Sequence, residues 1–306
     1  MFTQRLSLRN GLGWYGAVMN KDGPGNMEER RKGTDRRAGS FSRMADKSRE
    51  SSIVQGDERL IDAYRRWFEV VPATTPEQLE EVHRIRYQVY VLERGFEDPN
   101  DHPDGLEWDE FDPHSQHCLL IHKPTGMAAG TVRLVLPDKN APECSFPVQH
   151  VCQDPLLKDP TLFPVLTTGE ISRFSISKQF RRRQTDGAYP NVLDGNVDKK
   201  PESGDMRRII PHMTLGLMEA LVRMSVQNQV TYLCAAMERQ LLRLLSRMGI
   251  FFDPIGPPVD HHGIRQPCYR NILELLNQVK DEHVDVWEVI TDDGVHVAAL
   301  EELHRA

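Results

Sequence analysis

From residue 57 onward, apolar and polar residues alternate in runs that predict strands and helices in turn. The run WFEVVPA at 67–73 is rich in β-favouring residues and predicts a short strand. Thr75 followed by Pro76 predicts a helix start with Thr75 as N-cap, and the helix is expected to run to Gly95. A stripe at three- and four-residue spacing is expected to face the core: Leu79, Val82, Ile85, Val89 and Leu92.

The following segments predict a hairpin and then a second alternation of strands and helices. Two apolar runs, 116–122 and 127–136, flank the turn sequence KPTG and predict antiparallel strands. Further strands are expected at 169–176, 231–237 and 265–270, and helices at 209–229, 238–248 and 271–283. This order describes an α/β fold, in which one mixed sheet carries helices on both faces.

The chain is expected to divide into three parts. Residues 1–60 are predicted to form a disordered basic tail, since the first 56 residues hold 11 Lys and Arg against 6 Asp and Glu and show no apolar period. Residues 61–280 are predicted to form the globular domain, with a polar, basic insertion at 180–208. Residues 281–306 are expected to form a C-terminal extension.

Composition excludes several classes of protein. No run of about 18 apolar residues is present to span a membrane. The five cysteines are scattered without a CxxC pair, so neither a disulfide framework nor a zinc site is predicted, and a reducing cytoplasm is expected. His261 and His262 are expected in an exposed turn rather than a metal site. Nucleotide-binding glycine motifs are absent, and no nucleic-acid partner is predicted.

Charged residues are concentrated in segments whose neighbours are apolar. They occur in four blocks: Arg86 with Tyr90, Glu107 with Asp109 and Asp112, Arg133, and Glu170 with Arg173. Burying a charge costs several kcal/mol unless it has a partner, so such a cluster indicates either chemistry or a structural ion-pair network. The residues alone leave both interpretations open.

The order of these blocks resembles a known signature. Arg86-x3-Tyr90, Phe96, Glu107-x-Asp109-x2-Asp112, Gly130-x2-Arg133-Leu134 and Glu170-x-Ser172-Arg173-Phe174 look like the acyl-homoserine lactone synthases. The segment RYQVYVLERGFEDP at 86–99 is similar to the PEP-CTERM/exosortase system-associated acyltransferases. That group also resembles the N-acyl amino acid synthases. Two features depart from the lactone synthases: Phe96 stands where they usually have Trp, and the basic insertion from Arg181 to Arg208 is larger.

The resemblance implies a GNAT-like fold with a mostly antiparallel central sheet, and transfer of a fatty acyl group to the amine of an amino acid or related acceptor. The donor would be a thioester on acyl carrier protein or coenzyme A, with no tightly bound cofactor. The acceptor ammonium must lose a proton, for which Glu107 and Glu170 are the candidate bases, with Asp109 and Asp112 shaping the field. Backbone N–H groups of Phe174, Ser175 and Ile176 are expected to stabilise the tetrahedral intermediate.

Three arginines, Arg86, Arg133 and Arg173, are expected to bind the acceptor's carboxylate or to neutralise the acidic cluster. Tyr90 and Phe96 complete the expected substrate pocket. Arg181, Arg182 and Arg183 are predicted to attract an acidic acyl carrier protein. Two alternatives remain: a GNAT acetyltransferase that uses acetyl-CoA, and a non-catalytic acyl-binding regulatory module.

Overall fold

The computed structural model describes residues 59–181 and 206–305. The described residues all fall within one compact unit of the chain. The predicted tail at 1–60 lies outside the described residues, apart from Arg59 and Leu60. Most of the predicted insertion at 180–208 lies outside them as well.

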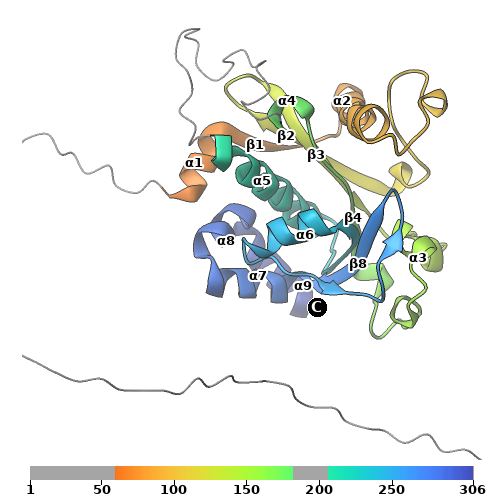
Figure 1. Ribbon diagram of the computed structural model, residues 1–306. Helices are drawn as coiled ribbons and strands as arrows, with labels where there is room; N and C mark the ends of the chain where they lie inside the picture. The colour runs from red at the N-terminus through yellow and green to blue at the C-terminus, as the bar shows by residue number, and fades with distance from the viewer. Residues whose placement is uncertain (1–58, 182–205, 306) are drawn as a thin grey trace, which may run out of the picture. The chain divides into compact units, whose positions relative to one another are not determined.

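Eight strands of the described part form one mixed sheet (Figure 1), in the order β1-β2-β3-β4-β5-β8-β6, with β7 paired to β8. Every pairing is antiparallel except that of β4 with β5, which is parallel. The strands are β1 Phe68–Pro72, β2 Ser115–His122, β3 Met127–Val135, β4 Thr168–Ile176, β5 Tyr232–Glu238, β6 Asp253–Pro254, β7 Val259–Asp260 and β8 Ile264–Asn271.

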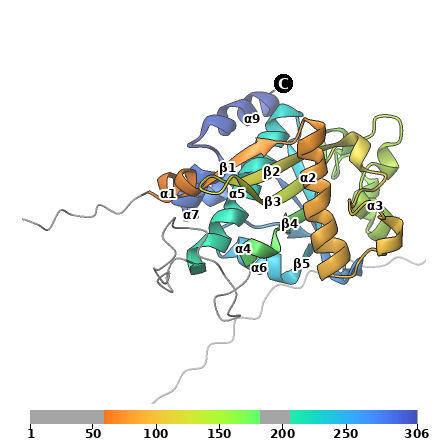
Figure 2. The same cartoon turned by 90° about the horizontal axis from the view of Figure 1, so that it is seen from above.

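Helices cover both faces of this sheet (Figures 1 and 2), as expected for the mixed α/β fold. Leu119 and Leu120 are neighbours on β2 but pack into different cores, Leu119 with α2 and Leu120 with α5. Since successive side chains of a strand face opposite sides, α2 and α5 lie on opposite faces. The helices are α1 Leu60–Trp67, α2 Pro76–Arg86, α3 Pro147–Val151, α4 Lys178–Arg181, α5 Met206–Gln227, α6 Arg239–Ser246, α7 Ile272–Glu282, α8 Val284–Ile290 and α9 Val295–Arg305.

Helix α2 begins as predicted but continues in a different form. Thr75 caps it through a reciprocal pair of hydrogen bonds with Gln78. After Arg86 the chain forms a π-helix, η1 Tyr87–Glu93. The wider turn shifts the helical phase, so the prediction that Leu92 faces the core is wrong: Leu92 is 64% exposed, and its neighbour Val91 is buried instead.

The C-terminal residues 281–306, expected as an extension, contribute to the main core. Helices α8 and α9 pack on α5, and the buried side chains of Val286, Val289, Ile290 and Leu300 belong to the same apolar cluster as α5 and the sheet. Five helices, α1, α3, α4, α8 and α9, have no counterpart in the sequence-based prediction. Four of the five have eight residues or fewer, and their apolar positions become informative only once their packing partners are known.

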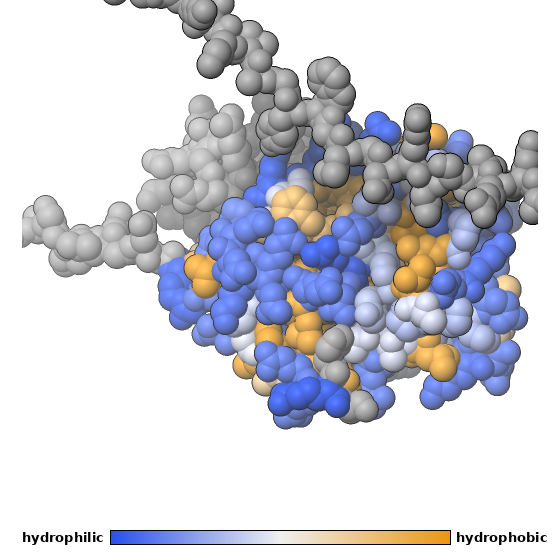
Figure 3. All heavy atoms as spheres, turned by 90° about the horizontal axis from the view of Figure 1, so that it is seen from below, coloured by the Kyte–Doolittle hydropathy of each residue, from blue (hydrophilic) through white to orange (hydrophobic). Residues whose placement is uncertain are grey.

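The surface of the described residues is mostly polar on one face (Figure 3). Hydrophilic residues make up much of the face drawn in Figure 3, and apolar residues lie between them in separate groups. Among the residues that the structure describes, no helix is long and apolar enough to cross a membrane. All five cysteines are free, and only Cys144 is exposed.

Candidate active site

Strands β4 and β5 separate part of the way along the sheet. Their parallel pairing ends at Ile171 opposite Ala235. Beyond that point β4 stays paired with β3 as far as Ile176, and β5 stays paired with β8 as far as Glu238. The two strands therefore diverge, although each stays paired with its other neighbour. The backbone of β4 and β5 beyond Ile171 and Ala235 faces a gap instead of a partner strand.

A bulge in β4 accompanies this separation. The β3–β4 register shifts between Thr131 and Arg133, and Arg173 has a φ of 50°, a left-handed conformation that costs a non-glycine residue energy. Close by, Gly130 leaves room for β4, because a Cβ atom there would lie 2.6 Å from the carbonyl oxygen of Ser175. The bulge therefore lies between Ser172 and Ser175 of β4.

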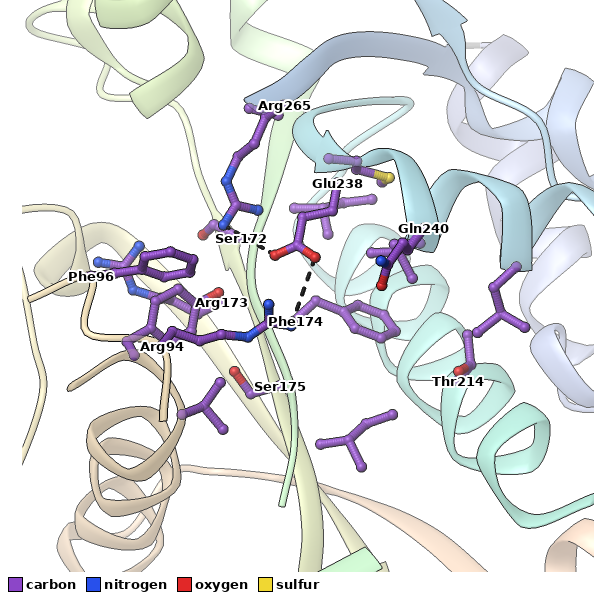
Figure 4. Close-up of a pocket in the computed structure, with 18 residues that line it drawn as sticks. Arg94, Phe96, Ser172, Arg173, Phe174, Ser175, Thr214, Glu238, Gln240 and Arg265 are labelled. Atoms are coloured by element: carbon purple, nitrogen blue, oxygen red, sulfur yellow. Dashed lines mark ion pairs between the residues drawn. The ribbon is translucent and has the colours of Figure 1, made fainter. Parts of the chain in front are cut away.

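A cavity of about 250 Å³ occupies the gap between the diverging strands (Figure 4). Its walls come from η1 and the residues that follow it, β4, α5, β5, α6 and β8. Its charged lining residues are Arg94, Arg173, Glu238 and Arg265. Of the residues predicted to bind substrate, Tyr90, Phe96, Arg173, Phe174, Ser175 and Ile176 line this cavity.

Six of the predicted charged residues form a closed ring beside the cavity. The ring alternates cations and anions, so each member has an oppositely charged neighbour on both sides, and its six side chains are Arg86, Glu107, Arg173, Asp109, Arg133 and Asp112. The guanidinium of Arg86 donates to both oxygens of Asp112 at 2.6 and 3.0 Å. That of Arg133 donates to both oxygens of Asp109 at 2.5 and 3.0 Å. We call this set the ion-pair ring.

The ion-pair ring keeps its carboxylates charged. Burial acts to raise the pKa of Glu107, but the guanidinium groups of Arg173 and Arg86 outweigh it and hold the pKa at about 2. The pKa of Asp112 is likewise lowered, because its hydrogen bonds and attraction to Arg86 outweigh its burial. Transfer of a proton from an ammonium of pKa about 8 to a group at pKa 2 costs about 8 kcal/mol. This cost disfavours Glu107 as the proton acceptor and favours a structural role.

Glu170 lies apart from both the cavity lining and the ion-pair ring. Its Oε2 atom accepts a hydrogen bond from the backbone N–H of Val148 at 2.8 Å, which ties α3 to β4. Burial raises the pKa of Glu170 to about 8, against the opposing influence of the Val148 N–H and Arg133. The carboxyl group is therefore largely protonated at neutral pH, and its contact with α3 indicates a packing role.

Aromatic side chains connect the ion-pair ring to the cavity. The guanidinium of Arg173 lies 4.7 Å from the ring centre of Tyr90, within cation–π range. The rings of Tyr90 and Phe96 lie 6.1 Å apart. Arg173 is thus the one member of the ion-pair ring that also lines the cavity. Its pKa is raised because Glu107, Tyr90 and Asp109 together outweigh the effect of burial.

Three lining residues, Arg94, Glu238 and Arg265, were not predicted. Arg94 lies 3.7 Å and Arg265 3.5 Å from the carboxylate of Glu238, and both guanidinium groups lie within about 6 Å of the Phe96 ring. The available signal was weak, because Arg94 and Arg265 lie beside glycine-containing turns and Glu238 is a single charged residue at the end of an apolar run. The histidine turn also differs from expectation: His262 is half-buried against Phe96, at a ring distance of 5.6 Å.

Some predicted features cannot be placed. Arg182 and Arg183 lie outside the described residues, and Arg181 is the last residue of α4. Among residues 59–181 and 206–305, no group of His, Cys, Asp and Glu side chains is arranged to hold a metal ion.

Comparison with known families gives one match. Residues 85–188 match the model of the acetyltransferase (GNAT) domain. This segment begins near the end of α2, includes β2, β3 and β4, and contains all six residues of the ion-pair ring. The mixed, mostly antiparallel sheet flanked by helices is the GNAT-like fold predicted from the sequence. The chain matches no curated protein.

Some solved structures of low sequence identity are similar to part of this chain. A CoA-dependent acyl-homoserine lactone synthase, BjaI, is 18% identical over 71% of this chain and 88% of its own, with a TM-score of 0.44. FeeM, an N-acyl amino acid synthase from uncultured soil microbes, is 13% identical over 69% of this chain and 94% of its own, with a TM-score of 0.42. The domain match confirms the predicted fold and supports the predicted enzyme class, an acyltransferase.

Proposed function

We propose that this protein is an N-acyltransferase that moves an acyl group from a thioester donor to the amine of a small acceptor. The observation that carries the proposal is the cavity between the diverging strands β4 and β5. One part of its wall is cationic and aromatic, and another is apolar. An acyl transfer site needs both, because a charged acceptor and an apolar acyl chain must meet there.

The diverging strands offer a way to hold the donor. An extended thioester arm, such as a pantetheine group, can lie along the edge of β4 that β5 leaves after Ile171 and hydrogen-bond to its backbone. Ser175 lines the cavity, and its buried Oγ atom has no hydrogen-bond partner among the described residues. A buried hydroxyl of this kind is usually satisfied by a ligand or water, so Ser175 is a candidate donor to a polar atom of the arm.

The apolar side of the cavity would take the acyl group. Phe174 points away from Phe96 and Arg173, toward α5 and α6 (Figure 4), where Leu241 and Leu244 also line the cavity. The volume of about 250 Å³ is small beside the 300–1,000 Å³ of typical ligand pockets. It accommodates the reacting ends of both substrates, and a long chain requires these apolar side chains to move apart.

The finer assignments extend the resemblance seen in the sequence. We propose a fatty acyl donor on acyl carrier protein or coenzyme A and an amino acid or related acceptor. Docking of an acidic carrier protein on Arg181, Arg182 and Arg183 and an association with a PEP-CTERM/exosortase system remain predictions. We propose that Glu107, Asp109 and Asp112 act by fixing Arg173 at the cavity rather than by moving protons.

Purified full-length protein tests the proposal directly. It is incubated with acetyl-, octanoyl- and palmitoyl-CoA and with the same acyl groups on a bacterial acyl carrier protein, together with a mixture of the twenty amino acids. The expected result is release of free thiol coupled to a new N-acyl amide seen by mass spectrometry, with a fatty acyl donor. Amide formation from acetyl-CoA alone would support the acetyltransferase alternative. No amide with any donor would contradict the proposed function.

A further inference from the structure

The four carboxylates predicted to take part in catalysis are engaged in other contacts. Glu107, Asp109 and Asp112 accept hydrogen bonds from arginines at 2.5 to 3.1 Å within the ion-pair ring. Glu170 is bonded to the backbone of α3 and does not line the cavity. Among the described residues that line the cavity, Glu238 is the single carboxylate.

Glu238 occupies a defined place at the open end of the gap. It is the last residue of β5, three positions beyond Ala235, where the pairing with β4 ends. Its backbone pairs with Arg265 on β8, which fixes its position while β4 turns away. Figure 4 shows its side chain directed toward Arg265 and Arg94, across the space between the strands. The residue therefore presents a carboxylate to anything that enters the gap.

The contacts of Glu238 are loose compared with those of the ion-pair ring. Its carboxylate lies 3.5 Å from Arg265 and 3.7 Å from Arg94, beyond ordinary hydrogen-bond length for a charged pair. Its side chain is 30% exposed, whereas that of Glu107 is 1% exposed. Partly exposed pairs of this length contribute little to stability. An entering cation can replace either arginine at a small energetic cost.

We propose that Glu238 binds the ammonium group of the acceptor and accepts its proton, and that Arg265 and Arg94 then bind an anionic group of the same acceptor. The inference rests on the proposed acyl transfer in this cavity. Apart from Arg173, whose charge is balanced within the ion-pair ring, the lining holds two arginines and one carboxylate, an excess of positive charge that favours an acceptor with an anion close to its amine. A neutral, unsubstituted amine would leave that excess uncompensated.

With this assignment, every proton that moves in the reaction is accounted for. The acceptor ammonium gives one proton to the Glu238 carboxylate, and the free amine attacks the thioester carbonyl carbon to form the C–N bond. As the tetrahedral intermediate collapses, the C–S bond breaks and the thiolate leaves. The thiolate takes the second proton from the nitrogen, which becomes the amide. Glu238 then returns its proton to water, so the enzyme is unchanged.

Glu238→Gln tests the role, with Glu97→Gln as the matched control. Glu97 is also a partly exposed carboxylate with ion-pair distances of 3.5 Å, to Arg173 and His262, but it does not line the cavity. With an amino acid acceptor at pH 7, Glu238→Gln should lower kcat/KM by about 100-fold or more, the scale of lost general-base catalysis. Glu97→Gln should stay within about threefold of the unmodified protein, since no proton transfer is removed.

Two further readouts separate proton transfer from structural damage. The deficit of Glu238→Gln should shrink as the pH rises toward the pKa of the acceptor amine, because more acceptor then enters uncharged. With hydroxylamine, an amine that is uncharged near neutral pH, the variant and the unmodified protein should transfer acyl groups at similar rates. A structural defect would lower both rates equally and would not depend on the acceptor.

The outcomes distinguish this inference from the function on which it rests. If the unmodified protein transfers acyl groups but Glu238→Gln matches it at pH 7, the assignment to Glu238 is wrong while the function stands. The same holds if the variant loses equal activity with hydroxylamine and with the amino acid. If the unmodified protein transfers nothing from any donor, the proposed function and this inference both fail.

Discussion

Replacing Arg86 with Gln tests whether the ion-pair ring is a structural unit. The side chain of Arg86 is fully buried and donates to Glu107 at 2.5 Å and to Asp112 at 2.6 and 3.0 Å. Without it the ring retains two arginines and three carboxylates, and so carries an uncompensated buried negative charge. Removing one partner of a buried ion pair typically costs about 3–5 kcal/mol of the free energy of unfolding.

A control lies two residues away on the same helix. Arg84 pairs with Glu80 and Glu81, but its side chain is 54% exposed. Exposed pairs contribute about 0–1 kcal/mol, so Arg84→Gln should change the free energy of unfolding by no more than this. For a domain of this size, about 3–5 kcal/mol corresponds to a fall in Tm of roughly 6–20 °C for Arg86→Gln.

Urea unfolding followed by tryptophan fluorescence, together with thermal unfolding, measures both variants. A third variant, Arg86→Gln with Asp112→Asn, removes one charge of each sign and restores neutrality. It should recover part of the stability lost in Arg86→Gln, because the uncompensated charge is gone. Equal losses in Arg86→Gln and Arg84→Gln would refute the conclusion that the ion-pair ring is a buried, mutually dependent network.

Two other predictions concern buried and exposed positions outside the ion-pair ring. The pKa of Glu170 is about 8, raised by burial from an ordinary value of 4.5, so between pH 5 and 8 the unfolded chain has released a proton that the folded protein keeps. Stability therefore falls as pH rises, by about 1.4 kcal/mol per pH unit, and Glu170→Gln should remove that slope in urea unfolding; an unchanged slope would contradict the assignment. Leu92→Ala should change the free energy of unfolding by less than about 0.5 kcal/mol, whereas Val91→Ala should cost about 2 kcal/mol. The reverse order would show that η1 is an ordinary α-helix.

Local sequence signals located much of the fold. Thr75 and Pro76 predicted where α2 begins, because capping depends on neighbouring residues alone. The apolar runs around KPTG predicted β2 and β3, because a short turn leaves few ways to pair two strands. Elements of this kind are specified within a few residues and need no knowledge of the rest of the chain.

Other features depend on contacts between distant residues. Nothing near Leu92 indicates a π-helix, since its wider turn is fixed by packing against the rest of the domain. The sequence predicted Arg86, Glu107 and Arg173 as site residues, but only the structure shows which arginine pairs with which carboxylate. The two interpretations of the charged cluster, a chemical role and a structural ion-pair network, could be separated only once the distances between these side chains were known.

The residues lining the cavity show the same limit. Glu238 follows an apolar strand as an ordinary terminal charge, and its significance comes from the divergence of β4 and β5. That divergence places it beside Arg94 and Arg265, which lie far from each other in the sequence. A single sequence has no local signal for such a juxtaposition.

Blocking the cavity tests the central claim most directly. Ala236 lies on β5 and lines the cavity, so Ala236→Trp should fill much of its volume of about 250 Å³. Ala128→Trp is the control, because Ala128 lines a separate cavity of about 280 Å³ between α2 and β3. With both variants shown to be folded, mass spectrometry of N-acyl product should find Ala128→Trp active and Ala236→Trp at least about 100-fold less active. Full product formation by folded Ala236→Trp would contradict acyl transfer between β4 and β5.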